Sequence, residues 1–373
     1  MSNFSTSAHA GSSWFQRYLL PGFAFKAVVI GGGYATGREL AEFFLPSGPR
    51  GAYLGMLLAM LVWSLVCVVT FCLAHLTQSR DYRAFFKHLL GPLWVLFEIV
   101  YLLAIVVILA VFGAAAGAIG AAVLGWPAVV GTCCLIACIC FVAAYGNESV
   151  ERLFKWVTFF LYGVYILFVA LSFHAFGAQI LQGLATPVPT TGWVLGGLTY
   201  AGYNVMGAVV ILPVLRHLRS ERDAVIAGAL SGPLAMLPAL LFFTCMMAYY
   251  PQIGAQALPS DFLLQRLNLP VFHILFQLMI FLALLESGTG CVHAFNERVA
   301  HVYATRSGRD LSRFARLTIT GLLLLGSIFL ATRFGLVTLI ARGYRGLSYL
   351  FLAVFVAPVM TLGVWRIWRA RRA

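Results

Sequence analysis

The chain has 373 residues, of which 61% are hydrophobic and 10% are charged, and it carries a formal net charge of +13. A soluble globular protein has roughly 25% charged residues, so this composition excludes an ordinary soluble domain. The apolar runs are long enough to cross a hydrocarbon core of about 30 Å, and they predict an all-α polytopic membrane protein.

The first half of the chain predicts five membrane spans. They follow a polar N-terminal tail (residues 1–16) that lacks the basic region and cleavage site of a signal peptide. The segment 81–90 alternates charged residues with Phe85 and Phe86, which predicts a helix lying at the cytoplasmic interface. The expected spans are residues 17–44, 51–76, 91–123, 126–145 and 150–173.

The second half predicts five more spans, which begin after a charge-free external loop at residues 174–192. A longer external loop, 250–270, is expected to contain a short helix at 261–267. A half-span at 336–341 precedes the last span, and the chain ends in a basic tail, 370–373. The expected spans are residues 193–215, 224–249, 272–296, 317–331 and 347–368.

The basic residues are unevenly distributed over these segments. With the N-terminus inside, most of the Lys and Arg residues fall in cytoplasmic segments, and both termini are cytoplasmic. This positive-inside bias predicts the orientation and accounts for the net charge without a nucleic-acid partner. The last three external arginines oppose the rule, so either they line an outer vestibule or the last segments are misplaced. The external arginines are Arg50, Arg266, Arg333, Arg342 and Arg345.

The eight cysteines do not predict a disulfide framework or a metal cluster. Four of them share one apolar span, where Cys behaves as a small hydrophobic residue. No CxxC pair or neighbouring histidine accompanies them. The four are Cys133, Cys134, Cys138 and Cys140.

Two of the spans are interrupted. The first contains the glycine run GGGYATG at residues 31–37, and each glycine in a helix costs up to about 1 kcal/mol relative to Ala. The sixth contains an irregular patch at residues 200–204. Each interrupted span opens a block of five, 17–173 and 193–369, and because five is odd the blocks have opposite topology. Interrupted segments at corresponding positions of two halves indicate a transporter site at the bilayer midplane.

The glycine run also matches the outline of a dinucleotide-binding fingerprint, because an apolar stretch precedes it and a helical stretch follows it. That motif requires an α/β domain and an acidic residue about 20 residues further on. Here the residues 51–76 form an uncharged apolar run. The setting therefore argues against a nucleotide cofactor.

In the transporter interpretation, the break frees backbone groups at both of its edges. The N–H groups of the second half-helix form a positive dipole end that can hold an anionic group, and the carbonyl groups at the other edge can coordinate a cation. The alternative is close helix packing through small residues. The expected substrate-binding residues of this run are Gly31, Gly33, Tyr34, Ala35, Thr36 and Gly37, and the expected carbonyl ligands belong to Val29, Ile30 and Gly33.

The patch in the sixth span supplies polar side chains of its own. Tyr200, Tyr203 and Asn204 offer two hydroxyl groups and an amide, which we expect to face the first break across a cavity. The alternative is that they are interfacial aromatic residues with an interhelical hydrogen bond.

Glu286 lies near the middle of the eighth span, where a carboxylate is expensive and marks a functional site by default. With Ser287 and Thr289 it offers oxygen ligands for a small cation, or it binds a proton. The alternative is a salt bridge to an internal base. The candidate bases are Lys26, Arg38 and Arg342.

Four other ionisable residues are candidates for gating or charge pairing: Lys26, Arg38, Glu39 and Glu98. Glu42 lies near the external end, where water reaches it. Glu98 and Tyr101 are one turn apart and either face the cavity or pair with a cytoplasmic base. No nucleophile–base arrangement indicates an enzyme.

The motif GGGYATGRE at residues 31–39, followed by two phenylalanines, resembles the opening motif of the YkvI-type bacterial membrane proteins. That family is similar to the amino acid–polyamine–cation transporter superfamily, with its LeuT-type inverted repeat of five plus five helices. The resemblance covers nearly the whole chain. Its other motifs are Tyr203-Asn204, Asn296-Glu297-Arg298 and the pattern GLVxLIxxGY at residues 335–344.

The resemblance implies a substrate between broken helices one and six, in the bacterial inner (cytoplasmic) membrane. In sodium-coupled relatives the cation lies between helices one and eight, which here corresponds to the carbonyls of residues 29–33 and to Ser287 and Thr289. Glu286 is an unusual charge for a sodium site, so a proton is an equal candidate. No cofactor other than a coupling sodium ion or proton is expected.

The sequence thus predicts a cation-coupled secondary active transporter, a symporter that moves a small organic solute by alternating access. An amino acid or a related amine or acid is the expected class of solute, and the bilayer is the other partner. A membrane-embedded ligand-binding sensor or scaffold without transport is the alternative. A membrane-bound dinucleotide enzyme is the third hypothesis.

Overall fold

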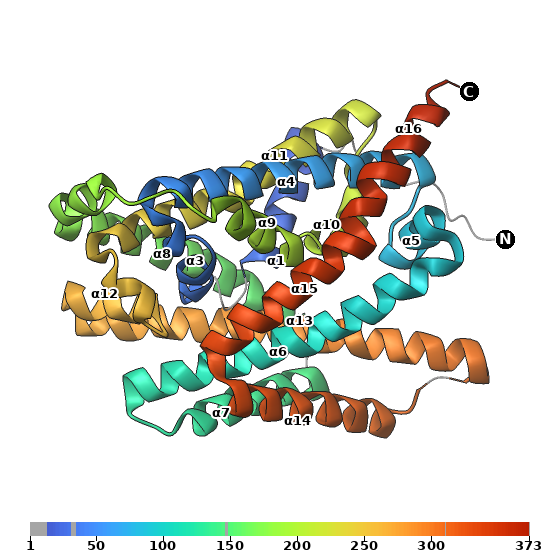
Figure 1. Ribbon diagram of the computed structural model, residues 1–373. Coiled ribbons are helices and arrows are strands. Elements are labelled where there is room, and N and C mark those ends of the chain that lie inside the picture. The colour runs from blue at the N-terminus through green and yellow to red at the C-terminus, as the bar shows by residue number, and fades with distance from the viewer. Residues whose placement is uncertain (1–12, 31–34, 146–147, 310, 373) are drawn as a thin grey trace.

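The computed structural model describes residues 13–30, 35–145, 148–309 and 311–372, and within them every regular element is a helix. The long helices run side by side along the molecule, as Figure 1 shows. Six stretches among the described residues are long and apolar enough to cross a membrane, and a shorter apolar helix covers residues 128–143. The predicted all-α polytopic fold is confirmed.

The helices of the first half follow the predicted spans closely. The first span is divided into two helices, and the short helix α5 (Tyr82–Leu90) lies where an interfacial helix was expected. Its start is fixed by Asp81, whose carboxylate accepts a hydrogen bond from the Ala84 N–H at 2.9 Å. The spanning elements are α1 (Leu20–Val29) with α3 (Arg38–Phe43), α4 (Gly48–Thr77), α6 (Trp94–Leu124), α7 (Ala128–Tyr145) and α8 (Glu148–Ala185).

The second half begins with another divided span and ends in a helix with several π-helical turns. Within α14, Gly335 takes φ 71° and ψ 169°, which breaks the helix where the half-span was predicted to begin. The elements are α9 (Trp193–Asn204) with α10 (Gly207–Val210), α11 (Glu221–Met246), α12 (Pro259–Leu267), α13 (Pro270–Ser307), α14 (Arg313–Thr338), α15 (Arg345–Phe351) and α16 (Val364–Ala370).

Two predicted boundaries are wrong. Residues 174–185 were expected in a loop, but α8 continues through them with a kink at Phe176, because these residues are mostly apolar and contain no proline. The patch 200–204 was expected to be irregular, but it is the last turn of α9. The interruption of helix six follows at Val205 and Met206, where the chain adopts a tighter turn with a hydrogen bond from Ala208 N–H to the Val205 carbonyl.

Small residues bring α4 and α11 into close contact, and the two helices lie together in Figure 1. A Cβ atom added at Gly228 would lie 2.5 Å from the Val68 nitrogen, and one added at Gly232 would lie 2.3 Å from the Met60 carbonyl oxygen. Backbone contact of this kind replaces the hydrophobic effect as the source of packing between helices in a membrane. It fixes helix seven against helix two, next to the divided helix one.

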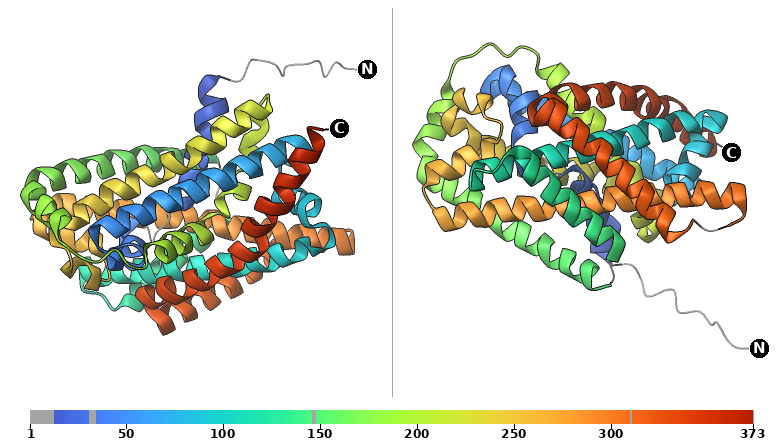
Figure 2. Two further views of the ribbon diagram at one scale, coloured as in Figure 1. Left: turned by 45° about the horizontal axis from the view of Figure 1, so that its top comes forward. Right: turned by 90° about the horizontal axis from the view of Figure 1, so that it is seen from below.

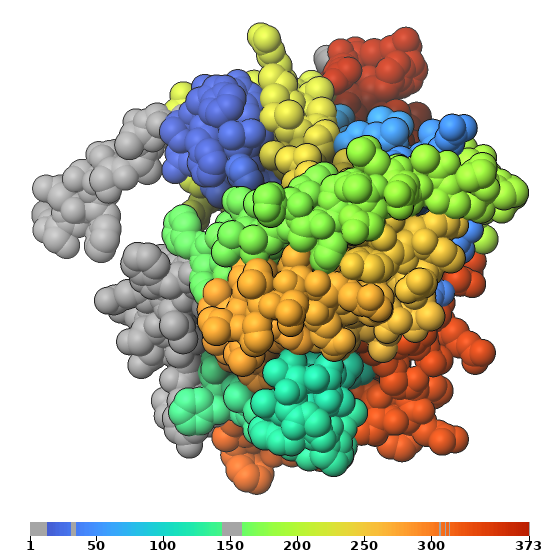
Figure 3. Space-filling view, turned by 90° about the vertical axis from the view of Figure 1, so that its left-hand side faces the viewer, coloured from blue at the N-terminus to red at the C-terminus, as the bar shows by residue number. Residues whose placement is uncertain are grey.

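The two ends of the bundle differ in what covers them. Helices α5 and α16 and the C-terminal end of α13 share one end (Figures 1 and 2). At the opposite end, seen in Figure 3, the segment around α12 packs beneath the loop that precedes α9. The first end carries α16 with its arginines and is the one we expect to be cytoplasmic.

Candidate functional site

Helix one is interrupted where the glycine run predicted it. Helix α1 ends at Val29, and Ile30 leaves the helical conformation with φ −77° and ψ 74°. Helix α3 starts at Arg38 after Gly37, which takes a left-handed φ of 77°. The predicted substrate-binding residues Gly31, Gly33 and Tyr34, and with them the Gly33 carbonyl proposed for the cation, lie outside the described residues.

Replacing Gly37 by Ala is expected to destabilise the protein by about 1–2 kcal/mol from the left-handed backbone alone. A further cost arises because the added Cβ would lie 2.4 Å from the Phe242 ring. The Gly91→Ala variant is the matched control, since Gly91 has φ +59° and an open space around its Cβ position. Thermal unfolding in detergent should show Gly37→Ala as the less stable variant; equal stability would contradict the close contact with Phe242.

Arg38 connects the divided helix one to the segment that precedes α12 (Pro259–Leu267). Its guanidinium donates hydrogen bonds to the carbonyls of Gly254 and Gln256 at 2.8 and 2.9 Å, and to the Glu42 carboxylate at 2.9 Å. Arg38 therefore does not form the salt bridge to Glu286 that was one alternative for that carboxylate. It closes the space between α3 and the segment that precedes α12.

Two further contacts strengthen this closure. The Ser260 N–H of α12 donates a hydrogen bond to the Thr36 carbonyl at 3.0 Å. Thr36, which was predicted to bind substrate, therefore already accepts a hydrogen bond from α12. Arg345 lies 3.8 Å from Glu42, which connects helix ten to helix one. Glu42 is thus paired rather than simply solvated. Arg345, one of the three arginines that were expected to oppose the positive-inside rule, lies beside this acidic group.

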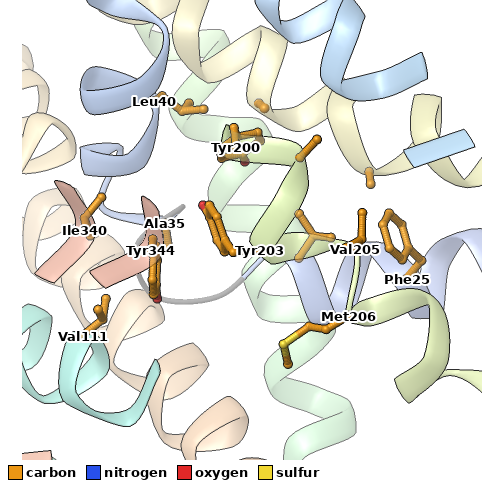
Figure 4. Close-up of a cluster of buried hydrophobic side chains, with 14 of the residues drawn as sticks. Phe25, Ala35, Leu40, Val111, Tyr200, Tyr203, Val205, Met206, Ile340 and Tyr344 are labelled. Atoms are coloured by element: carbon orange, nitrogen blue, oxygen red, sulfur yellow. The ribbon is translucent and has the colours of Figure 1, made fainter. Parts of the chain in front are cut away.

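Glu39 and Tyr203 join helices one and six across the interruption. The Tyr203 hydroxyl donates a hydrogen bond of 2.5 Å to the Glu39 carboxylate, which is 3% exposed. The Tyr203 ring stacks on Tyr344 with ring centroids 4.4 Å apart, and Figure 4 shows both rings beside Ala35. Glu39 has no ion pair with any described residue, so a buried carboxylate and two stacked phenol rings gather at the predicted site.

The other residues of the predicted wall behave differently. Tyr200 is fully buried between Phe44 and Trp63, with ring centroids 4.8 and 5.4 Å away, and its hydroxyl has no hydrogen-bond partner among the described residues. The Asn204 amide donates to the Tyr200 carbonyl of its own helix at 3.0 Å. Tyr200 and Asn204 are therefore engaged in packing and within helix six, and among the described residues of the divided helix a hydrogen bond reaches only Tyr203 of the three.

Replacing Tyr203 by Phe is expected to destabilise the protein by about 1–3 kcal/mol, because it leaves a buried carboxylate without its donor. The Tyr344→Phe variant should be nearly neutral, since the ring stacking remains. Unfolding in mixed micelles measures both free energies. A Tyr203→Phe variant as stable as Tyr344→Phe would show that the hydroxyl does not support Glu39.

A mostly apolar cavity of about 180 Å³ touches both edges of the interruption. Ile30 and Ala35 contribute one wall, and Lys26 lies among the lining residues. Side chains of α8, α11 and α13 complete the cavity: Leu161, Tyr162, Tyr165, Ile166, Leu237, Pro238, Leu241 and Met279. We call it the apolar cavity.

A second cavity of about 220 Å³ lies between helices one and eight. It is lined by Ile30, Glu286 and Ser287, together with Ala27, Val28, Leu161, Tyr162 and Ala283. Glu286 has no ion pair or hydrogen bond with the described residues. We call it the acidic cavity.

Two of the predicted cation ligands do not line the acidic cavity. Val29 faces the packed core and is 3% exposed. Thr289 has a buried hydroxyl without a hydrogen-bond partner in the described part of the chain. The geometry therefore groups Ile30, Glu286 and Ser287 and leaves Val29 and Thr289 apart.

Tyr162 lines both cavities, as Ile30 and Leu161 do. The Lys26 ammonium lies 4.1 Å from the centre of its ring, an attractive cation–π contact. No salt bridge between Lys26 and Glu286 is present among the described contacts. Sequence reasoning did not select Tyr162, because a single aromatic residue in an apolar span carries no pattern.

Glu98 pairs with the base Arg298 of α13, and pairing with a base was one of the two predicted outcomes. Its carboxylate accepts two hydrogen bonds from the Arg298 guanidinium, the longer one at 2.5 Å. The two side chains are 11% and 10% exposed. This ion pair connects α6 to α13 far from the acidic cavity, so Glu98 does not face the candidate site.

The described residues contain no group of three or more His, Cys, Asp and Glu side chains able to hold a metal ion. The site consists instead of hydroxyl, carboxylate and ammonium groups around an apolar cavity. Such a site is suited to a small organic ligand or a light cation.

An interrupted helix one that meets an interrupted helix six inside an all-helical polytopic protein is the LeuT-type fold. Solved structures similar to this chain include the following two. MhsT in complex with L-phenylalanine has a TM-score of 0.58 and 17% identity, covering 96% of this chain and 98% of MhsT. The Eremococcus coleocola manganese transporter, in complex with an aromatic bis-isothiourea compound, has a TM-score of 0.55 and 17% identity, covering 95% and 80%.

The sequence comparison gives one more relative. The chain is 23% identical over 332 residues to the uncharacterized membrane protein YkvI of Bacillus subtilis (strain 168), covering 89% of this chain and 92% of YkvI. No family model matches the chain. The predicted resemblance to the YkvI-type proteins and to the LeuT-type fold is confirmed.

Proposed function

We propose that this protein is a cation-coupled secondary active transporter of a small organic solute that works by alternating access. The observation that carries the proposal is Glu286, which lines the acidic cavity with Ile30 at the interruption of helix one. An unpaired carboxylate within a membrane-spanning helix is costly. A coupling cation that binds Glu286 neutralises the carboxylate and offsets this cost. When the cation leaves during transport, the cost returns.

A proton is proposed as the coupling ion. Glu286 lines the acidic cavity, and a carboxyl group within a membrane-spanning segment can take up and release a proton. Sodium remains the other candidate, and Ser287 is then its hydroxyl ligand.

The solute is proposed to bind at the interruption of helix one, where Ile30 and Ala35 line the apolar cavity and where Glu39 meets Tyr203 of helix six. A pocket of apolar walls with a few polar groups is typical of sites for small organic molecules. One protein of the same fold binds L-phenylalanine, which supports an amino acid or a related amine or acid.

A ligand screen followed by exchange tests the proposal. Thermal unfolding of the detergent-purified protein over a set of amino acids and amines, with and without sodium, identifies a bound compound. Counterflow in proteoliposomes preloaded with that compound then shows whether the protein carries it. Binding without counterflow would favour the membrane-embedded sensor over the transporter.

A further inference from the structure

A third cavity lies at the end of the molecule that carries α5, away from the interruption of helix one. It has a volume of about 570 Å³ and lies between α5, α6 and α13. Polar side chains dominate its lining: Asp81, Tyr82, Arg83, Lys87, Tyr101, Glu297, Arg298 and His301. Nothing in the proposed transport mechanism uses this cavity.

Three cations converge on one indole ring beside it. The distances to the Trp94 ring centre are 4.8 Å for the Arg83 guanidinium, 5.5 Å for the Lys87 ammonium and 5.6 Å for the Arg298 guanidinium. Each cation is attracted to the ring, but the three charges repel one another. Arg83 and Lys87 are four residues apart on α5, a spacing at which like charges destabilise a helix.

The acidic groups around this cavity are already engaged. Glu98 is bound by Arg298, and Glu297 pairs with Arg316 at 2.6 Å. The third, Asp81, accepts the hydrogen bond that caps α5. The lining itself holds three cations, Arg83, Lys87 and Arg298, and two carboxylates, Asp81 and Glu297, so positive charge is in excess there.

Arg83 and Lys87 are the two cations of this cavity that form no ion pair with a described residue. The Nε of Arg83 and the hydroxyl of Tyr82 are buried without a hydrogen-bond partner in the part of the chain that the structure describes. Both residues line the cavity, and donors without acceptors beside a cluster of cations indicate that an anionic acceptor belongs there.

We propose that Arg83 and Lys87, held over Trp94, bind a phosphate group at the membrane surface. A guanidinium and an ammonium donate charge-assisted hydrogen bonds to phosphate oxygens. The apolar face of α5, with Phe85 and Phe86 fully buried, seats this helix against the bundle and turns its basic residues outward. The phosphate belongs either to an anionic phospholipid headgroup or to a free phosphate ion, since the recognising chemistry is the same.

The test compares lipid and free phosphate on the full-length protein. Native mass spectrometry and thermal unfolding are measured in phosphatidylcholine micelles, with phosphatidylglycerol or with inorganic phosphate added. The wild type is expected to retain phosphatidylglycerol and to unfold at a higher temperature with it. Each basic residue near a membrane surface contributes about fivefold in affinity, so the Arg83→Gln/Lys87→Gln variant should bind about 25-fold more weakly.

Arg369→Gln is the matched control, because Arg369 lies 5.4 Å from the Trp365 ring without a second cation on that ring. It should bind like the wild type. A response to inorganic phosphate that the double variant loses would assign the site to free phosphate. Binding of neither probe by the wild type, or equal binding by a folded double variant, would overturn the proposal.

Discussion

Replacing Glu98 by Gln is expected to lower the free energy of unfolding by about 3–5 kcal/mol, because breaking a buried ion pair leaves the other charge uncompensated. The pair is well suited to this effect. Both guanidinium nitrogens that face the carboxylate donate to it, and the two side chains are 10% and 11% exposed. Arg298 would then remain near Arg83 and Lys87 without its carboxylate.

The chain offers a matched control for this prediction. Glu297 and Arg316 form an ion pair whose side chains are 53% and 38% exposed, and such a pair contributes about 1 kcal/mol or less. Unfolding in mixed micelles of Glu98→Gln and Glu297→Gln measures both. The double variant Glu98→Leu/Arg298→Met should recover most of the loss. Equal stabilities of the two single variants would contradict a buried, paired Glu98.

Replacing Glu286 by Gln is expected to reduce gradient-driven accumulation of solute to background while solute exchange continues. Glutamine keeps the shape of the side chain but neither binds a proton reversibly nor holds a negative charge for sodium. The coupling cation then has no site, although the apolar cavity and Tyr203 are unchanged. Uptake and counterflow on the same proteoliposomes separate the two effects.

Glu221→Gln serves as the control for this second prediction. Glu221 begins α11, pairs with Arg371 and is 40% exposed in its side chain, so its charge lies outside the bundle interior. Its variant should accumulate solute like the wild type. Accumulation by Glu286→Gln at the wild-type level would remove Glu286 from the coupling mechanism.

Much of the fold was predictable, because membrane-spanning helices are recognised in a sequence as apolar runs of sufficient length. The interruption of helix one was predictable as well, since three consecutive glycines do not sustain a helix. These two inferences rest on local properties of the sequence. The meeting of helix one with Ser287 of helix eight was instead implied by the resemblance to sodium-coupled transporters, and only the choice of Glu286 came from its place within an apolar span.

The contacts between distant residues were not predictable in the same way. Arg298 is 200 residues from Glu98, and the sequence offered several bases for that role. Tyr344 belongs to a motif of the YkvI-type resemblance, but nothing local shows that it stacks on Tyr203. The end of helix α9 was misplaced because the Tyr200–Asn204 segment has a glycine and polar groups, yet tertiary packing around Tyr200 keeps it helical.

Solute accumulation in proteoliposomes under an imposed gradient tests the proposed transport most directly. The compound is the one identified by thermal unfolding, and a proton gradient and a sodium gradient are applied separately. We expect accumulation above equilibrium driven by the proton gradient, and its loss when a protonophore dissipates that gradient. Accumulation driven by sodium alone would assign the acidic cavity to sodium. Saturable binding without accumulation under either gradient would contradict transport.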